Sequence, residues 1–425
     1  EIREKLNKKY NKKEWLDLIS IIFPKIDIFQ IPLKKTLDES KSKIAKSIIE
    51  YAYIELTDNR KISFFEVELN PNKDVTKNRV ELRNLISKDL ISGVKDGALV
   101  VYYSNEKEQY RFTFISKQTK ITEDGDFEEY ETDTKRFTYV LGSTESCNTP
   151  AERFFKLSQI KDKKLSDIEE AFSVEKLSKA FFDEYKKHYD IFCKYLLDKP
   201  NIFKSIFAGD DKQVRDFAKK LLGRIVFLYF IQKKGWLGVP VEKNWGDGDK
   251  NFLFNHFQRF KNPELFFKDF LSVLFFDTLN KKRDNDIFEI DSDDDLFSKN
   301  EKVKIPFLNG GLFEEDDARQ RNIIFERQLF TNLFNFFNQY NFTIYEDDPN
   351  DHTVAVDPEM LGHIFENLLE DNKDKGAFYT PKVIVHYMCQ ESLIEYLCTN
   401  LQIEDEAKER EAITTLLKKK KLMKF

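Results

Sequence analysis

The sequence predicts a mixed α and β fold that is mostly helical, and three observations support this class. Short runs rich in aromatic and β-branched residues surround one helical pattern over the first 145 residues. Apolar residues at helical spacing dominate from residue 149 onward. Glycine is scarce, with 14 in 425 residues, which is about half its usual share. Few glycines mean few tight turns, which excludes collagen, Gly-rich linkers and glycine-punctuated all-β folds.

The overall composition bounds both size and compartment. The chain has 69 Lys and Arg against 75 Asp and Glu, and 41% of its residues are hydrophobic. These values are typical of a globular chain of about three domains. The mildly acidic net charge argues against a binder that holds nucleic acid by charge alone, while local basic patches stay open. The four cysteines form no CxxC pair and the sequence opens without a signal-peptide pattern; we therefore expect a cytoplasmic protein.

The first 145 residues predict a small α/β unit. Residues 42–50 have a helical or mixed pattern, and the turn at 57–60 separates two β-rich runs that predict a hairpin. A helix over 75–90 follows, with an apolar side, and residues 122–135 are expected to form a charged loop or hairpin with a turn at Asp124 and Gly125. Strands are expected at 51–56, 62–69, 97–103 and 110–116.

Residues 146–350 predict a helical connector domain. Thr149, Pro150 and Glu152 have the pattern of a helix start, with a threonine cap, proline at the first helical position and a glutamate that completes a capping box. Further helices are expected over 177–196 and 212–233, and one is expected to begin at residue 263. Residues 245–249 and the acidic tract 284–295 are expected to be loops.

Residues 351–425 predict a third part that begins with two helices. Asp357 is followed by proline and glutamate, which is again a capped helix start. The helical pattern breaks at 373–376, and a second helix is expected to begin at Pro381 with Thr380 as its N-cap. A basic tail closes the sequence.

The hexapeptide from Gly376 to Pro381 is a candidate ligand site. Thr380 leaves a hydroxyl and unpaired backbone N–H groups at a helix N-terminus, which suit a carboxylate or a phosphate. Phe378 and Tyr379 add aromatic faces on which a flat ring can lie. The alternative is an ordinary Thr-Pro helix start with packed aromatic neighbours.

Carboxylates around the predicted hairpin form a second candidate site. Metal-dependent nucleases of the PD-(D/E)xK kind hold Mg²⁺ with an Asp and a Glu on adjacent strands, and a Lys two residues after the Glu completes the site. Asp58 in the turn and Glu66 on the following strand are therefore candidate Mg²⁺ ligands, and with Glu68 they are candidate catalytic residues. Glu68 stands where the lysine belongs, and the first acid could equally be Glu50 or Glu55.

Arg79 and Arg83 lie four residues apart on the predicted helix and are candidate DNA-phosphate contacts. Acidic residues on the same helix favour the alternative of a solvated, mixed-charge face. An active nuclease and an inactive, degenerate one stay equally open. In the inactive one, Glu66 and Glu68 pair with these arginines.

Several segments resemble one family of enzymes. The segment DPEMLGHIFENLLEDNKDKGAFYTPKVIVHYM resembles the start of the methyltransferase domain in type IIG restriction–modification enzymes, the Eco57I-like adenine-specific DNA methyltransferases. Other segments resemble the same family in the expected order along nearly the whole chain: FFEVEL with NRVELRNL, RFTYVLGSTESCNTPAERF, IQKKGWLG and IPFLNGGLF.

The resemblance implies a nuclease-like α/β domain over 1–145, the connector over 146–350 and the first helices of a class I methyltransferase domain over 351–425. It implies transfer of a methyl group from S-adenosylmethionine to adenine N6 in double-stranded DNA, with cleavage of unmodified DNA by Mg²⁺ as a second activity. A restriction or specificity subunit is an implied partner. The cofactor site would include Gly376, Ala377, Phe378, Tyr379, Thr380 and Pro381, with Thr380 on the methionine carboxylate.

The family's glycine loop and NPPY-type catalytic tetrapeptide are not in this sequence, which has no NPP tripeptide. We therefore expect this chain to lack the methyltransferase catalytic motif and to hold only one wall of the cofactor site. The alternative hypothesis is a non-catalytic module with a degenerate nuclease fold that binds DNA or a partner protein.

Overall fold

A computed structural model describes residues 1–75, 82, 85–86, 96–116, 135–289, 302–308, 311–343, 351–358, 360, 362 and 382–400. The fold is mixed α and β and mostly helical, as predicted, with about 51% of residues in helices and 19% in strands. The chain forms two compact units, Glu1–Leu361 and Gly362–Phe425. The three-domain division stays a prediction. Among the helices described, none is both long and apolar enough to cross a membrane.

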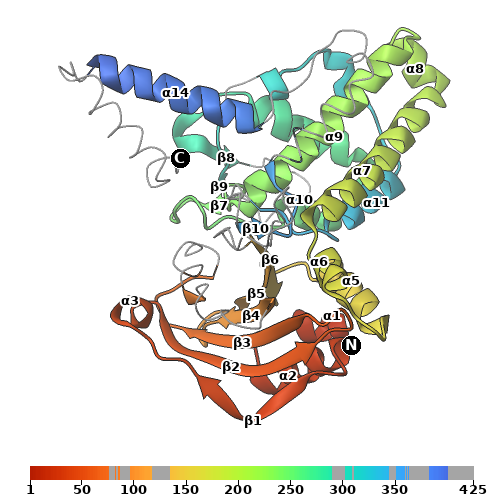
Figure 1. Cartoon of the computed structure of the whole chain (residues 1–425). Coiled ribbons are helices and arrows are strands. Elements are labelled where there is room, and N and C mark those ends of the chain that lie inside the picture. Colours follow the sequence, from red (N-terminus) through yellow and green to blue (C-terminus); the bar gives the residue numbers. More distant parts are fainter. Residues whose placement is uncertain are drawn as a thin grey trace. The chain divides into compact units, whose positions relative to one another are not determined.

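A seven-stranded mixed sheet organises the N-terminal part of the first unit (Figure 1). The strand order is β1-β2-β3-β4-β5-β6-β10, in which β3 pairs parallel with β4, β6 pairs parallel with β10, and the other neighbours are antiparallel. The strands are β1 (Asp27–Lys34), β2 (Ala45–Glu55), β3 (Lys61–Leu69), β4 (Gly97–Tyr103), β5 (Gln109–Ser116), β6 (Lys135–Gly142) and β10 (Asp351–Thr353).

The predicted hairpin and the two strands after it are confirmed as β2, β3, β4 and β5. The helical or mixed pattern proposed for 42–50 is wrong beyond α3 (Glu39–Ser42), because residues from Ala45 onward belong to strand β2. Strand β6 was not predicted, and most of the proposed loop at 122–135 lies outside the described residues. Neighbouring strands thus overrode a weak local helical preference at the start of β2.

Both faces of the central strand β3 are covered. Its odd-numbered residues Phe65 and Val67 pack with Leu85 and Ile86 in one buried cluster. The predicted apolar side of the 75–90 helix is buried at the positions described there, namely Leu82, Leu85 and Ile86. Burial on both faces explains why β3 is an almost continuous apolar run interrupted by acids.

The opposite face of the sheet packs against three helices, α1 (Ile2–Leu6), α2 (Lys12–Ile22) and α5 (Asn148–Gln159). The Trp15 ring on α2 stands edge-on to Phe112 of β5, with 4.8 Å between ring centroids. The Trp15 indole N–H donates to the Tyr51 hydroxyl at 3.1 Å. The Phe154 ring on α5 also stands edge-on to Phe112. Aromatic contacts therefore fix these helices on the sheet.

The remainder of the first unit is helical, as predicted. Its helices are α6 (Leu165–Ala171), α7 (Val174–Leu197), α8 (Pro200–Ile206), α9 (Asp211–Lys233), α10 (Phe252–Arg259) and α11 (Arg327–Phe337). Helices α7 and α9 lie side by side (Figure 1). The helix expected from residue 263 is a 3₁₀ turn at Pro263–Leu265 followed by π-helical segments Phe266–Leu271 and Val273–Leu279.

Shorter elements complete this half. A small antiparallel sheet has the order β7-β9-β8. Its strands are β7 (Val239–Pro240), β9 (Lys302–Lys304) and β8 (Ile287–Glu289). Further 3₁₀ turns lie at Asp284–Asp286, Gly311–Phe313 and Ala318–Asn322.

Helix starts were predicted with mixed success. Helix α5 begins at Asn148 with Cys147 at its N-cap, so the predicted cap at Thr149 and first helical position at Pro150 are wrong. The capping box is wrong too: the Thr149 hydroxyl donates to the Gln339 carbonyl at 3.2 Å, and Glu152 pairs with Lys156 at 2.6 Å. Thr149 thus binds a partner from a distant part of the chain and Glu152 binds a lysine one turn along the same helix, so neither side chain caps α5. The predicted cap at Asp357 is confirmed, since its carboxylate accepts the Met360 N–H at 2.8 Å. In the second unit, α14 (Lys382–Asn400) forms the helix expected after Pro381.

Phenylalanine rings fill the core between the helices. Phe181 on α7 is fully buried and lies 5.0 Å from Phe336 on α11 and 5.0 Å from Tyr340, measured between ring centroids. The apolar pattern predicted for 177–196 is therefore the core face of α7. Such ring clusters explain the use of the 41 Phe residues in this sequence.

We expect Phe181→Ala to lower the free energy of unfolding by about 3–5 kcal/mol, because it leaves a cavity in the aromatic cluster. Phe155→Ala is the matched control: Phe155 is 56% exposed on α5, so its loss should change stability by no more than about 0.5 kcal/mol. Urea denaturation of both variants measures the difference. Equal destabilisation by the two would contradict this packing.

Candidate functional site

Asp58 does not join the other predicted acids. It lies in the turn between β2 and β3, where its carboxylate accepts the Leu165 N–H at 3.0 Å at the start of α6. Glu66 lies five residues beyond Lys61, the first residue of β3. At about 3.3 Å per residue, Glu66 is therefore about 17 Å along the strand from the turn. The expected Mg²⁺ pair of Asp58 and Glu66 is therefore not assembled by this fold.

Glu66 lies on the sheet face that carries α1 and α2, and it is 3% exposed. Its two carboxylate oxygens take different donors: the Tyr10 hydroxyl at 2.9 Å and the Lys12 ammonium at 2.6 Å. Both donors come from the α1–α2 connection and the first turn of α2. The buried carboxylate is thus neutralised by one cation and one neutral donor.

Two tyrosines, Tyr10 and Tyr103, lie next to the Glu66 carboxylate. The Tyr10 ring stacks on Tyr103 of β4, with 4.0 Å between centroids. Burial, followed by the charge of Glu66, raises the pKa of the Tyr10 hydroxyl far above its usual range. The same two causes raise the pKa of Tyr103. Both hydroxyls therefore stay protonated at neutral pH, and Tyr10 acts as a donor to Glu66 rather than as a base.

Glu68 lies two residues further along β3 on the same face as Glu66, where the strand approaches solvent. Its carboxylate accepts from Lys46 of β2 at 3.1 Å and from the Asn105 side-chain amide at 3.0 Å. Asn105 follows β4 directly. The residue that replaces the expected motif lysine is therefore held by a lysine from the neighbouring strand.

The two alternative first acids are also accounted for. Glu50 pairs with Phe65 across the ladder, whereas Glu66 pairs with Ile49, so the Glu50 and Glu66 side chains leave the sheet on opposite faces. The Glu50 carboxylate is almost fully buried and pairs with Lys35 at 2.7 Å. Glu55 is exposed near the turn and lies 3.7 Å from Lys61.

The four glutamates considered for the nuclease site thus each lie beside a separate lysine, while Asp58 binds a backbone N–H at the start of α6. Within the ranges that the structure describes, no three His, Cys, Asp or Glu side chains gather closely enough to hold a metal ion. A Mg²⁺ site needs several oxygen ligands on one cation. The donor set around Glu66, with one acid, one ammonium and one phenol, does not fit that requirement.

Sequence reasoning missed the partners of these acids, namely Tyr10, Lys12, Lys35, Lys46, Tyr103 and Asn105. The signal that was available is the basic, tyrosine-containing stretch NKKYNKK at residues 7–13, which runs into the first turn of α2. Predicted residues Arg79 and Arg83, and the cofactor segment Gly376, Ala377, Phe378, Tyr379, Thr380 and Pro381, lie outside the described residues.

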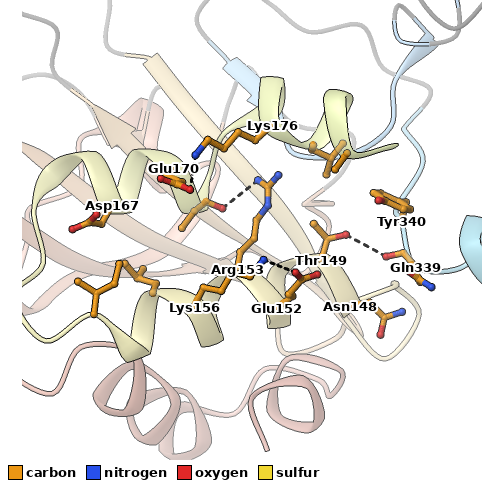
Figure 2. A pocket seen from close by; sticks show the side chains of 15 residues that line it. Asn148, Thr149, Glu152, Arg153, Lys156, Asp167, Glu170, Lys176, Gln339 and Tyr340 are labelled. Atoms are coloured by element: carbon orange, nitrogen blue, oxygen red, sulfur yellow. Dashed lines mark hydrogen bonds and ion pairs between the residues drawn. The ribbon is translucent and has the colours of Figure 1, made fainter. Parts of the chain in front are cut away.

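A polar pocket of about 300 Å³ lies between α5, the start of α7 and the turn after α11 (Figure 2). Arg153 reaches across it and donates to the Ser173 carbonyl at 2.7 Å and to the Tyr139 hydroxyl at 3.2 Å. Lys156 pairs with Glu152, and Lys176 pairs with Glu170. Both lysines are thus neutralised by glutamates, and Arg153 is held by neutral oxygens. The polar groups named here are therefore engaged with one another.

We expect Lys12→Ala to destabilise the chain by about 2 kcal/mol, because it leaves the buried Glu66 carboxylate with the Tyr10 hydroxyl but without a cation. Adding Glu66→Gln to Lys12→Ala should recover most of that loss by removing the charge. Lys13→Ala is the matched control, since Lys13 is exposed on the same helical turn. Chemical denaturation of the three variants and the unmodified chain measures these differences. Equal destabilisation by Lys12→Ala and Lys13→Ala would contradict the ion pair.

Comparisons of this chain with protein-family models, with curated proteins and with solved structures found no match.

Proposed function

We propose that this chain is the N-terminal part of a restriction–modification enzyme that methylates adenine N6 in DNA with S-adenosylmethionine. We further propose that its N-terminal sheet is a nuclease-like fold with a non-catalytic role in binding DNA or a partner protein. One observation carries the second statement: Glu66 and Glu68 of the expected cleavage site are held by separate lysines, Lys12 and Lys46, and the alternative first acid Glu50 is held by Lys35.

The order of elements supports a nuclease-like fold. Helix α2 leads into three antiparallel strands, and β4 then returns parallel to β3 after the connection over residues 70–96. A parallel return requires a crossover across one face of the sheet. Leu82, Leu85 and Ile86 of that connection are buried against the β3 face that carries Phe65 and Val67. The hairpin and the two strands after it match that part of the layout on which the nuclease prediction rests.

Electrostatics support a non-catalytic role for this sheet. Hydrolysis with Mg²⁺ needs carboxylates that share the cation and position a water on phosphorus. Here an ammonium lies 2.6 Å from the Glu66 carboxylate, in the place where a cation would have to bind. The Glu66 carboxylate is buried whereas the Lys12 side chain is half exposed, so the ammonium neutralises a charge that the fold has removed from water.

The methyltransferase part of the proposal is supported by sequence order. Five family-like segments occur in the expected sequence along the chain, and the segment Gly376–Pro381 directly precedes a helix, α14. A helix N-terminus with a threonine hydroxyl suits the carboxylate of methionine. The missing NPP tripeptide assigns the transfer step to the whole parent enzyme rather than to this chain.

Incubation of the purified chain with supercoiled plasmid and Mg²⁺ or Mn²⁺ tests the non-catalytic role. We expect no metal-dependent nicking above that of Glu66→Ala. Glu106→Ala is the matched control, because Glu106 is an exposed acid of the same sheet, in the turn between β4 and β5. Nicking by the unmodified chain that Glu66→Ala abolishes and Glu106→Ala preserves would overturn the proposal.

The methyltransferase assignment is tested on the full-length gene product with labelled S-adenosylmethionine and unmethylated DNA. We expect label on adenine N6, and we expect Thr380→Ala to weaken cofactor binding about tenfold, the effect of one lost hydrogen bond to a charged group. Thr399→Ala is the control, since that hydroxyl bonds only within α14, to the Glu395 carbonyl. No incorporation into any DNA would exclude the assignment.

A further inference from the structure

The loop between β7 and α10 presents an exposed tryptophan. Trp245 is 41% exposed, whereas Trp15 in the core is 3% exposed. Four of the 14 glycines of the chain lie within residues 235–248, so a residue type that is scarce elsewhere is concentrated here. These glycines shape the loop that carries Trp245.

The glycines make the loop compact and fix its shape. The Gly235 carbonyl accepts both the Gly246 N–H and the Gly248 N–H at 3.0 Å, and the Asp249 N–H donates to the Leu237 carbonyl at 3.0 Å. Gly235 has φ +73°, and a Cβ there would lie 2.1 Å from the Gly246 carbonyl oxygen. Only glycine permits that approach. Trp245 is thus displayed on a cross-linked loop rather than on a free one.

Two neighbouring indoles of this loop each have a lysine ammonium over the ring. Trp236 and Trp245 meet edge to face, with 6.3 Å between ring centroids. The Lys234 ammonium lies 3.8 Å from the Trp236 centroid, and the Lys304 ammonium lies 5.6 Å from the Trp245 centroid. Lys304 also donates to the Lys243 carbonyl, which joins β9 to the loop. We name Lys234, Trp236, Lys243, Trp245 and Lys304 the Trp245 surface.

Acidic residues of the loop limit, but do not cancel, this positive character. The Asp249 carboxylate accepts the Asn251 N–H and the Asn255 side-chain amide, both at 2.8 Å, and so belongs to the start of α10. Glu242 and Asp247 are exposed on the same loop. A partner bound here must therefore gain more from the indole than from charge alone.

We propose that the Trp245 surface binds single-stranded nucleic acid, with a base stacked on the indole of Trp245 and flanking phosphates on the lysines. Aromatic side chains in a lysine-rich setting are the usual means of holding an unpaired strand, because every base has a π-face and every nucleotide a phosphate. In a duplex the base faces are already stacked, so the indole favours an unpaired nucleotide. This surface lies apart in sequence from Glu66 and does not depend on the proposed methyl transfer.

Binding of a labelled, mixed-sequence single strand to the whole chain, followed by fluorescence anisotropy, tests the proposal. We expect Trp245→Ala to weaken binding about tenfold and Trp245→Phe to retain part of it, since base stacking on an aromatic ring is lost in the first variant only. Lys234→Gln should weaken binding and lower its salt dependence. Val241→Ala is the matched control, because Val241 is likewise 41% exposed on this loop.

Three results would overturn the proposal: no binding of the strand, equal binding by Trp245→Ala and the unmodified chain, or tighter binding of a duplex of the same sequence. Urea denaturation of each variant tests whether it is folded. If Trp245→Ala does not fold, the comparison of Trp245→Phe with the unmodified chain still tests the proposal. Failure of methyl transfer by the parent enzyme would leave these binding results unchanged, so the two proposals fail separately.

Discussion

Strand β3 is buried on both faces, and much of the N-terminal structure follows from that constraint. One face needs an apolar layer, which Leu82, Leu85 and Ile86 provide. The other needs a second layer, which α1, α2 and α5 provide through aromatic contacts such as Trp15 with Phe112. Any charged residue on such a strand must find its partner within the protein, because water is excluded from both sides.

The acids of the sheet meet that requirement in the same way three times. Glu50, Glu66 and Glu68 each pair with a lysine from a different part of the chain: Lys35 directly after β1, Lys12 at the start of α2, and Lys46 on β2. A metal centre requires several oxygen ligands to converge on one cation. Here each of these carboxylates has a counter-charge of its own instead.

The helical half solves a different problem with two residue types. Phenylalanine fills the spaces between α7, α9 and α11, as around Phe181, with rings that interlock edge to face and tilted. Glycine is used sparingly and is concentrated around 235–248, where the backbone folds back on Gly235. Several of the few glycines are thus placed in one loop, where their backbone freedom allows a tight fold. Hydrogen bonds to the Gly235 carbonyl then hold that loop in one shape.

The sequence by itself determined the mostly helical mixed class, the hairpin of β2 and β3, strands β4 and β5, and helices α7 and α9, because each has a strong local period of apolar residues. It did not predict β6, the strand at residues 45–50 or the hydrogen-bond partners of Thr149 and Glu152. At these positions, contacts with residues outside the local segment set the structure. The candidate acids were visible in the sequence, but their partners were not. Only the tertiary structure separated Asp58 from Glu66 and placed Glu50 on the opposite face, because strand register fixes which side chains share a face and a one-residue change reverses it.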